Sequence, residues 1–447
     1  MRIAYIAAGA AGMYCGSCLH DNTLAAALLE LGEDVVLVPT YTPLRTDEAN
    51  VSIERIFFGG VNVYLQQKSA LFRRTPWWLD RLLDHPALLE RLARRAASVD
   101  PTQLGEMTVS MLRGEAGYQR KELEKLARWL ADEIRPDVVH LSNSMQAGMA
   151  RMLRRRRGPP IVCQLSGEDL FLEKLPPPHY DQARALLRER AADVDAFVAV
   201  NRYYADFMAD YLGIPAAKFH ITPLGIDTGD FVALEPKRDE PDDRPPRVGY
   251  LARLAPEKGL HVLVDAFLAL RRLPGMERAE LHVAGWLGEH RRKYAEEQFD
   301  KLRAAGLGDA LHYAGSVDRH GKVEFLRQLD VLSVPTVYRE PKGLFVLEAL
   351  AMGVPVVQPN HGAFPELIEW TGGGRLVRPE DPAHLALVLH ELLTDHAARR
   401  ELGRCGRESV LARFNADAMA QQALELYAKH VPELLPSAVQ MPEPAAR

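Results

Sequence analysis

Residues 2–40 decide the fold class of this chain: RIAYIAAGAAGMYCGSCLHDNTLAAALLELGEDVVLVPT. The apolar run RIAYIAA (2–8) is followed by a glycine-containing loop and then by LHDNTLAAALLELG (19–32), which has helical periodicity and ends at Gly32. A second apolar run, DVVLVPT (34–40), completes the segment. Strands without polar alternation are typical of parallel sheets that are covered on both faces, so this segment predicts a βαβ unit.

The length and composition of the chain predict a soluble protein of two domains. The 447 residues exceed what one ordinary core holds. With 47% hydrophobic and 26% charged residues and a net charge of −5, nothing in the balance favours a nucleic-acid partner. The amino terminus does not read as a signal peptide, and no run of about 18 uncharged apolar residues appears, which predicts a cytoplasmic location. The cysteines are too few for a disulfide framework: Cys15, Cys18, Cys163 and Cys405.

The strand and helix pattern continues through an N-terminal domain that we place at residues 1–234. Further apolar runs at 137–142, 160–165 and 196–200 alternate with helical segments. The pattern stops at EPKRDEPDDRPP (235–246), where prolines and charges replace apolar periodicity. Such a composition is typical of an interdomain linker.

A second domain of the same type is predicted at residues 247–415. The runs RVGYLAR, ELHVAGW, LHYAGSV, DVLSVPT and VPVVQP predict strands, with helical segments between them. Helical periodicity continues to about His430, and we expect the proline-rich residues 432–447 to form a flexible tail. Two Rossmann-like, doubly wound parallel sheets would present the carboxyl ends of their strands to one central cleft, where ligands bind in such folds.

Residues 66–130 depart from this rhythm, because they form a long segment of helical pattern between strands of the first domain. One interpretation is a helical cap with Trp77 and Trp78 packed inward. The other is a surface that selects the acceptor or contacts the inner face of a membrane through residues 72–81, where Phe72, Trp77 and Trp78 lie beside Arg73, Arg74 and Arg81.

The most informative motif is REPKGLFVLEALAMGVPVV at residues 339–357, which follows a predicted strand. The turn therefore lies at the carboxyl edge of a sheet, and Gly343 opens a helix whose free backbone N–H groups favour an anion. Glu340 and Glu348 flank this helix start. Two acceptors around an anion site suit a diphosphate with a sugar at one end and a ribose at the other. The alternative is that the glutamates only balance the helix dipole.

A second motif, GYLARLAPEKGL (249–260), places Arg253 and Lys258 in a loop after a strand. We expect both cations to face the same cleft and to offset the charge of a departing diphosphate. From the other domain, the loop after the first strand would deliver Gly16 to the cleft. Its glycine spacing does not match G-x-G-x-x-G, so NAD binding is not indicated.

Two further motifs have structural interpretations. The only D-x-D pair, Asp193 and Asp195, lies at the amino end of a predicted strand, the wrong edge for a metal that holds a diphosphate, so we assign no metal site. PLGID (223–227) forms a tight turn before the linker. Its glycine, Gly225, either faces the cleft or only makes the turn.

Together these motifs resemble the retaining glycosyltransferases of family 4, which have the GT-B fold. The resemblance covers most of the chain and rests on EPKGLFVLE (340–348), the family's E-x7-E signature, on GYLARLAPEKGL (249–260), on PLGID (223–227), and on CGSCLHDNTLAAALLELG (15–32), in which Cys15 replaces the first glycine of the family's loop. It implies a nucleotide-diphosphate sugar as donor, no cofactor and no metal. It also implies that a terminal helix at 416–431 returns to the first domain.

The resemblance also implies roles for individual residues. Arg253 and Lys258 would bind the donor diphosphate, Glu340 would contact the donor sugar and Glu348 the ribose, with catalysis depending on Glu340, Arg253 and Lys258. The backbone that holds phosphate and sugar would be Gly343, Leu344 and Phe345.

One departure concerns the reacting end. Many family members have a histidine after the strand matching PIVCQL, and this chain has Ser166, with Glu168 and Asp169 nearby. Our hypothesis is retaining, metal-independent transfer of a sugar to an acceptor hydroxyl on a glycan, a lipid or a small molecule. The alternatives are a nucleotide-sugar epimerase on the same fold and a nucleotide-sugar-binding protein without catalytic activity. The donor base, the acceptor and the oligomeric state stay open.

Overall fold

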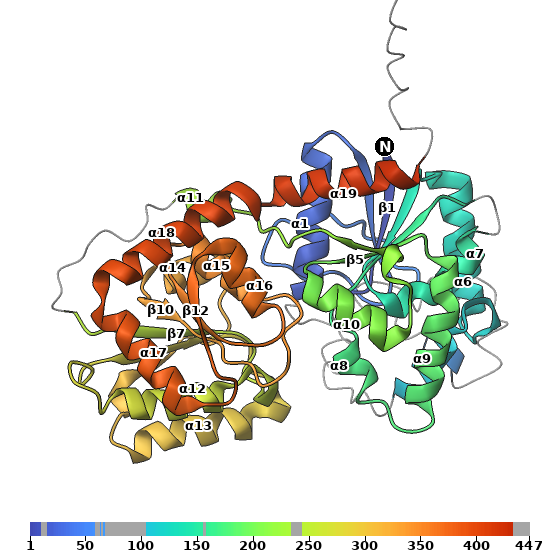
Figure 1. The fold of residues 1–447 in the computed structure, drawn as a ribbon. Helices are drawn as coiled ribbons and strands as arrows, with labels where there is room; N and C mark the ends of the chain where they lie inside the picture. The colour runs from blue at the N-terminus through green and yellow to red at the C-terminus, as the bar shows by residue number, and fades with distance from the viewer. Residues whose placement is uncertain are drawn as a thin grey trace, which may run out of the picture.

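The computed structural model describes residues 1–9, 16–58, 63, 66–67, 104–154, 158–233 and 244–431. Two α/β domains lie side by side, each built on a parallel sheet with helices around it (Figure 1). The predicted fold class, two doubly wound parallel-sheet domains, is confirmed.

The first sheet has the strand order β2-β1-β3-β4-β5-β6, and all of its pairs are parallel. Its central strands are buried along their whole length, which is why they are mainly apolar, with His140 in β3 and Gln164 in β4 as buried polar exceptions. The short edge strand β6 was not predicted, because two of its three residues are only partly buried, Ile221 is exposed, and the segment is too short to form an apolar run. The bounds are β1 Arg2–Ala7, β2 Asp34–Pro39, β3 Val138–Leu141, β4 Ile161–Gln164, β5 Ala196–Ala199 and β6 Phe219–Ile221.

The helices of the first domain connect these strands. Asn201 caps α10 through its side chain, which accepts a hydrogen bond from the Tyr204 N–H, and Gly213 ends the helix in the left-handed conformation. The bounds are α1 Gly16–Glu30, α5 Gly105–Leu112, α6 Arg120–Trp129, α7 Ala150–Arg154, α8 Asp169–Leu172, α9 His179–Arg190, α10 Arg202–Leu212 and α11 Gly229–Ala233, with a π turn at Leu130–Ile134.

The described part of the helical segment 66–130 packs into the first domain. Leu112, Leu126 and Trp129 belong to its buried core, and the Gln66 amide donates to Glu122 across the segment. This half of the segment is therefore part of the domain core. The aromatic and arginine residues at 72–81, which were assigned either to a cap or to an acceptor or membrane surface, lie outside the described residues.

The second sheet has the order β12-β11-β10-β7-β8-β9, again with parallel pairs only. The strand predicted from DVLSVPT is shorter than expected, because only two of its residues pair regularly. The edge strand β12 was not predicted from its mixed sequence GRLV. The bounds are β7 Arg247–Leu251, β8 Glu280–Ala284, β9 Leu311–Tyr313, β10 Val331–Leu332, β11 Val356–Pro359 and β12 Gly374–Val377.

The helices of the second domain surround one large apolar core. Helix α15, which follows β10, buries seven of its eight residues, and this explains the nearly uninterrupted apolar sequence after Gly343. The bounds are α12 Leu260–Leu270, α13 Arg292–Ala304, α14 Arg319–Arg327, α15 Leu344–Ala351, α16 Phe364–Thr371, α17 Pro382–Thr394 and α18 His396–Arg413.

The last helix, α19 (Ala416–His430), crosses from the second domain and lies along α1 of the first (Figure 1). Its apolar face, including Met419 and Tyr427, is buried in the same cluster as α1 and β1. The Tyr427 hydroxyl and the His140 Nδ1 are 2.5 Å apart, and the His140 ring stacks on Tyr5 at 4.3 Å between centroids. Apolar burial and one polar contact thus hold the returning helix on the first domain.

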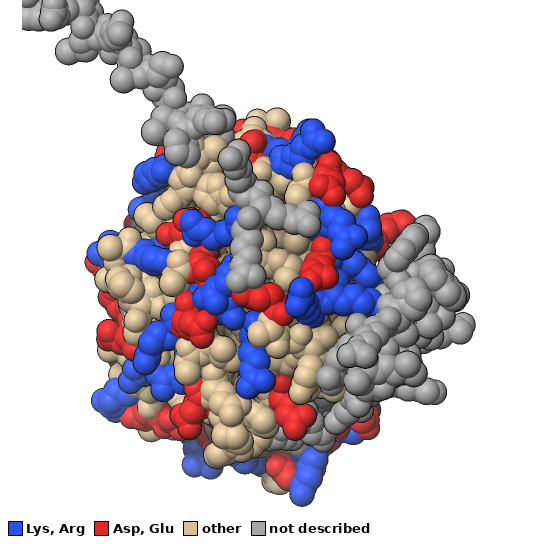
Figure 2. All heavy atoms as spheres, turned by 90° about the vertical axis from the view of Figure 1, so that its right-hand side faces the viewer, with Lys and Arg blue, Asp and Glu red and all other residues tan. Residues whose placement is uncertain are grey.

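The outer face of the first domain shows basic and acidic side chains interspersed (Figure 2). Among the described residues, no helix has both the length and the apolar composition needed to cross a bilayer. The predicted tail, Cys15 and most of the predicted linker lie outside the described residues.

Candidate active site

A buried cluster of three polar side chains lies at the carboxyl edge of the second sheet. Lys258 follows β7 and Glu340 follows β10, and because these strands are parallel neighbours, both loops leave the sheet at the same edge. The Lys258 Nζ is 2.6 Å from the Glu340 Oε2. The Tyr338 hydroxyl donates to the same oxygen at 2.5 Å and accepts from Lys258 at 2.6 Å. We call these three residues the Glu340 cluster.

The Glu340 cluster holds its carboxylate in the ionised form. Glu340 is only 5% exposed, and burial alone would raise its pKa. The ammonium of Lys258 and the hydroxyl of Tyr338 oppose this effect, and the net pKa of Glu340 lies below its usual value. Burial and the nearby Glu340 charge raise the pKa of Tyr338, so its hydroxyl remains a donor.

The start of α15 provides an anion site next to this cluster. Gly343 precedes the helix at φ 73°, and a Cβ there would come within 2.6 Å of Leu367. Helical geometry leaves the first N–H groups, those of Leu344 and Phe345, without an intrahelical partner. The second oxygen of Glu340, Oε1, is 3.4 Å from the Gly343 nitrogen, a weak contact that leaves it able to accept from a ligand.

Glu348 lies deeper along α15 and has a different partner. It is also 5% exposed, and its Oε1 accepts from the Lys322 Nζ at 2.6 Å. The same ammonium donates to the Asp47 Oδ2 of the first domain at 2.6 Å. Burial lowers the pKa of Lys322, but the charges of Glu348 and Asp47 outweigh it and the net pKa is raised. Lys322 therefore stays charged between two carboxylates from different domains.

Of the two predicted cations, Lys258 and Arg253, only Lys258 contacts one of the two glutamates of the motif. Lys258 contacts Glu340 directly, whereas the Arg253 side chain is 46% exposed and its nearest acid is Glu257 at 3.8 Å. Burial raises the pKa of Tyr338, and the positive charge of Arg253 opposes part of this rise. Arg253 thus stands at the rim of the site, with its guanidinium accessible to a ligand.

The first domain contacts the loop between Glu340 and Gly343. A Cβ on Gly16 would lie 3.9 Å from the Leu344 side chain, so the start of α1 faces the start of α15. The Lys342 ammonium donates to the Ser17 hydroxyl at 2.8 Å, and the Asn201 amide donates to the Pro341 carbonyl at 2.7 Å. The structure therefore brings Gly16 to the same cleft as the E-x7-E motif.

The candidate residues of the reacting end already have protein partners. The Glu168 Oε1 accepts from the Ser144 N–H and its Oε2 from the Ser166 N–H, both at 2.8 Å. Asp169 accepts from the Tyr204 hydroxyl at 2.7 Å. Burial raises the pKa of Glu168, although these backbone N–H groups act in the opposite direction. These carboxylates therefore organise the loop beside the cleft.

A cavity of about 550 Å³ opens between the domains beside this loop. A Cβ on Gly362, in its wall, would come within 2.7 Å of the Glu340 backbone, so the cavity reaches the backbone of Glu340, although its lining does not include the side chains of the Glu340 cluster. Most of its lining residues carry polar side chains, but apolar atoms contribute more of the lining surface. The lining residues are Arg202, Tyr203, Arg339, Asn360, His361, Gly362, Pro365, Glu366, Glu369 and Trp370.

The sequence motifs did not single out Tyr338, Lys342, Lys322 or Asp47. Tyr338 and Lys342 flank Glu340 within two positions, so their closeness in sequence was the available signal, although the Lys342 ammonium contacts Ser17 and not the Glu340 cluster. No local signal exists for the contact of Lys322 with Asp47, since the two residues are 275 positions apart.

Two motifs from the sequence lie away from the cleft. Gly225 packs against the start of α19, where a Cβ would come within 2.3 Å of the Asn415 carbonyl oxygen, so it makes the turn. Asp193 accepts from Arg151 and Asp195 accepts from the Ile161 N–H, both at the amino end of the first sheet.

Two family models match the chain. The one described as Glycosyltransferase Family 4 matches residues 105–230, and the one described as Glycosyl transferases group 1 matches residues 233–409. The D-inositol 3-phosphate glycosyltransferase of Stackebrandtia nassauensis is 30% identical over 344 residues, covering 73% of this chain and 73% of that protein. The glycogen synthase of Mycobacterium tuberculosis is 27% identical over 323 residues, covering 70% and 72%.

Solved structures share the fold over nearly the whole chain. The structure of Anabaena HepE in complex with UDP matches with a TM-score of 0.66 at 16% identity, covering 96% of this chain and all of that one. The expected GT-B arrangement of the two domains is thereby confirmed.

Proposed function

The chain belongs to glycosyltransferase family 4 and is a glycosyltransferase, and from this premise we propose that it moves a sugar from a nucleotide-diphosphate donor to an acceptor hydroxyl, with retention and without a metal ion. The observation that carries the proposal is the buried Glu340 cluster beside the open N–H groups of α15, with Gly16 facing it from the other domain.

In the proposed complex the diphosphate lies at the start of α15. The backbone N–H groups of Leu344 and Phe345, together with the cations of Lys258 and Arg253, bind its oxygens, and each charge-assisted hydrogen bond contributes about 1.5–3 kcal/mol. Glu340 accepts a hydroxyl of the sugar through its Oε1, the oxygen with the weaker protein contacts. Glu348 accepts the ribose hydroxyls at the other end of the diphosphate.

Retention follows from attack on the face that the diphosphate leaves. The bond between the anomeric carbon and the phosphate oxygen breaks, the acceptor oxygen bonds to the same face, and its proton passes to a phosphate oxygen. Because Glu168 and Asp169 are engaged with protein donors, we assign neither as a covalent nucleophile. Lys258 and Arg253 offset the charge that develops on the leaving diphosphate, the task that a metal performs in other transferases.

We place the acceptor in the cavity next to Glu340. Its volume of about 550 Å³ is within the usual range for small-molecule sites and is large enough for a sugar or a cyclitol. The two relatives described above differ in their named products or acceptors, glycogen and inositol 3-phosphate, and both of these are polyhydroxylated. The polar side chains of the cavity can donate to and accept from the hydroxyls of such an acceptor, and its apolar surface can pack against the sugar ring.

Donor binding is tested by thermal unfolding in EDTA with UDP-glucose, GDP-mannose and ADP-glucose. We expect one of them to raise the unfolding temperature, because the anion site and the glutamates need no added ion. Stabilisation that appears only after Mg²⁺ or Mn²⁺ is restored would overturn the metal-free assignment. The stabilising donor is then incubated with inositol 3-phosphate and with glycogen. NMR of the product reports the anomeric configuration, and an inverted product would refute retention.

The role of Glu340 is tested with Glu340→Gln, with Glu324→Gln on the exposed side of α14 as the matched control. We expect Glu340→Gln to lower turnover about 10²- to 10³-fold, the loss typical when one preorganised electrostatic contact is removed. The control should keep full activity. Equal activity in the two variants would remove Glu340 from the mechanism.

A further inference from the structure

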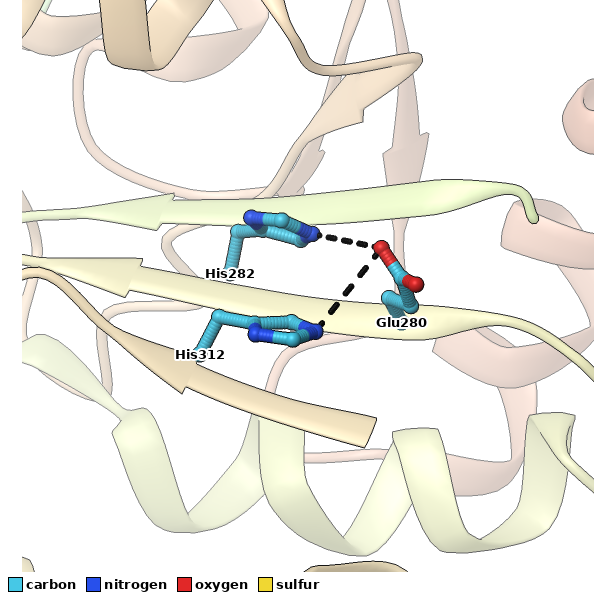
Figure 3. A group of neighbouring side chains, drawn as sticks. All are labelled: Glu280, His282 and His312. Carbon is cyan, nitrogen blue, oxygen red and sulfur yellow. Dashed lines mark hydrogen bonds and ion pairs between the residues drawn. The ribbon is translucent and has the colours of Figure 1, made fainter. Parts of the chain in front are cut away.

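Three side chains gather on one face of the second sheet, away from the cleft (Figure 3). Glu280 and His282 lie two residues apart on β8 and so point to the same face, and His312 is the direct neighbour of His282 on the edge strand β9. The strand register alone therefore places two imidazoles and a carboxylate together.

The ligand atoms of these residues converge. The His282 Nε2 is 2.9 Å and the His312 Nε2 is 3.8 Å from the Glu280 Oε2, and the ligand atoms of all three lie within 4.8 Å of one another. With bonds of about 2.0–2.1 Å, the ligands of a tetrahedral zinc ion are about 3.3 Å apart. The observed separations bracket this value, so small side-chain rotations suffice for all three to reach one ion.

The side chains of this cluster are held in place by the sheet, and one of them is accessible to solvent. The His282 side chain is 12% exposed and is held in the sheet, whereas the His312 side chain is 47% exposed at the edge. Arg247 on β7 donates to the Glu280 Oε2 at 3.1 Å and holds the carboxylate toward the histidines. An ion can approach from the side of His312.

We propose that Glu280, His282 and His312 bind one divalent transition-metal ion of the Zn²⁺ or Cu²⁺ type. Two imidazole nitrogens favour these ions over Mg²⁺ and Ca²⁺, which prefer oxygen ligands. Three protein ligands leave a fourth position for water. Arg247 acts on the site in two opposed ways: its hydrogen bond orients the Glu280 carboxylate, and its positive charge disfavours a bound cation.

The site is independent of the proposed sugar transfer. Glu280 begins β8 at its amino end, whereas the loops that carry Lys258 and Glu340 follow the carboxyl ends of their strands. A bound ion would join the edge strand β9 to β8 and stabilise that edge of the sheet. Failure of the metal site would leave the assignment of Glu340 untouched.

The test is a titration of the EDTA-treated full chain with Cu²⁺, followed by EPR, and with Zn²⁺, followed by calorimetry. We expect one equivalent to bind and the Cu²⁺ spectrum to show coupling to two imidazole nitrogens. In His312→Gln, an exposed position where folding is safe, coupling should fall to one nitrogen and Zn²⁺ affinity should drop at least about tenfold. His290→Gln, at an exposed position outside the cluster, is the matched control.

A second readout is thermal unfolding. Zn²⁺ should raise the unfolding temperature of the unaltered chain and of His290→Gln, and this rise should be lost in His312→Gln and Glu280→Gln. Binding of equal affinity in His312→Gln and His290→Gln, or a Cu²⁺ spectrum unchanged by His312→Gln, would overturn the proposal.

Discussion

Glu340 and Glu348 belong to one motif and are equally buried, but they are neutralised in different ways. The partners of Glu340, Lys258 and Tyr338, come from its own domain. Glu348 shares Lys322 with Asp47, which belongs to the other domain. One end of the proposed donor site is thus complete within a single domain, and the other is tied to the contact between the domains.

This difference indicates that the sugar end and the ribose end of a donor would be recognised in different ways. The side chains of the Glu340 cluster contact one another within one domain, so we expect the proposed sugar end to be preorganised even when the domains move apart. Glu348 differs, because a movement that separates the domains would break the contact between Asp47 and Lys322. The Lys322 ammonium would then contact only Glu348. A ribose that needs Glu348 is therefore sensitive to the domain arrangement, as expected of a two-state closure.

The largest expected effect comes from Lys258→Met, which leaves the Glu340 charge buried without its cation. We expect a loss of about 3–5 kcal/mol in the free energy of unfolding and a turnover at least about 10²-fold lower. Urea denaturation and the transfer assay measure the two losses.

The control for Lys258→Met is Lys301→Met, which removes an exposed pair with Asp265 and should cost at most about 0.5 kcal/mol. Adding Glu340→Gln to Lys258→Met should recover part of the stability, because no buried charge then remains unpaired. If the double variant is less stable than Lys258→Met, the charge pair is not the source of the loss.

The next prediction concerns the pH dependence of the free energy of unfolding. This dependence distinguishes the contact of α19 with the first domain, which contains His140, from the Glu340 cluster. Burial lowers the pKa of His140 to about 3, so the folded state keeps this ring neutral while the unfolded state takes up a proton below about 6.5. Stability is therefore lost as the pH falls, by about 2 kcal/mol between pH 7 and pH 5. Urea denaturation at a series of pH values measures the slope.

Glu340 does not contribute to the pH dependence between pH 7 and pH 5. Its folded pKa is lowered, so the stability it contributes is present above the unfolded value of 4.5 and is lost only as the pH falls through the folded value. His140→Gln should therefore flatten the pH dependence between pH 7 and pH 5, while Glu340→Gln should not. A slope that persists in His140→Gln would assign the acid sensitivity to another group.

The smallest effect concerns the contact between the domains. Asp47→Asn removes one of the two negative charges that contact Lys322. We expect this loss to weaken the contact between the domains by about 1 kcal/mol. We expect donor affinity to fall about fivefold, measured by calorimetry with the stabilising nucleotide sugar. Glu54→Gln, at an exposed position of the same domain, is the control. If donor affinity is unchanged in Asp47→Asn, binding at the proposed ribose end does not depend on the contact between the domains, and this prediction is wrong.

Much of this arrangement could be predicted from local patterns. The mainly apolar sequences of β1, β3, β4 and β5 indicated buried parallel strands, because both of their faces are covered. The short strands β6 and β12 were missed, since an edge strand needs no such sequence and pairs through its backbone. For the site, the fold class already predicted that the loops after β7 and β10, which carry Lys258 and Glu340, leave the second sheet at its carboxyl edge.

What the sequence by itself determined is the pair of parallel domains and the placement of Lys258, Glu340 and the start of α15 at one sheet edge. The physical reason is that parallel strands bring the loops at their carboxyl ends together. Only the tertiary structure decided that Lys322 lies between Glu348 and Asp47. Any of many acids could neutralise a lysine, and which one does so depends on how two separate domains pack.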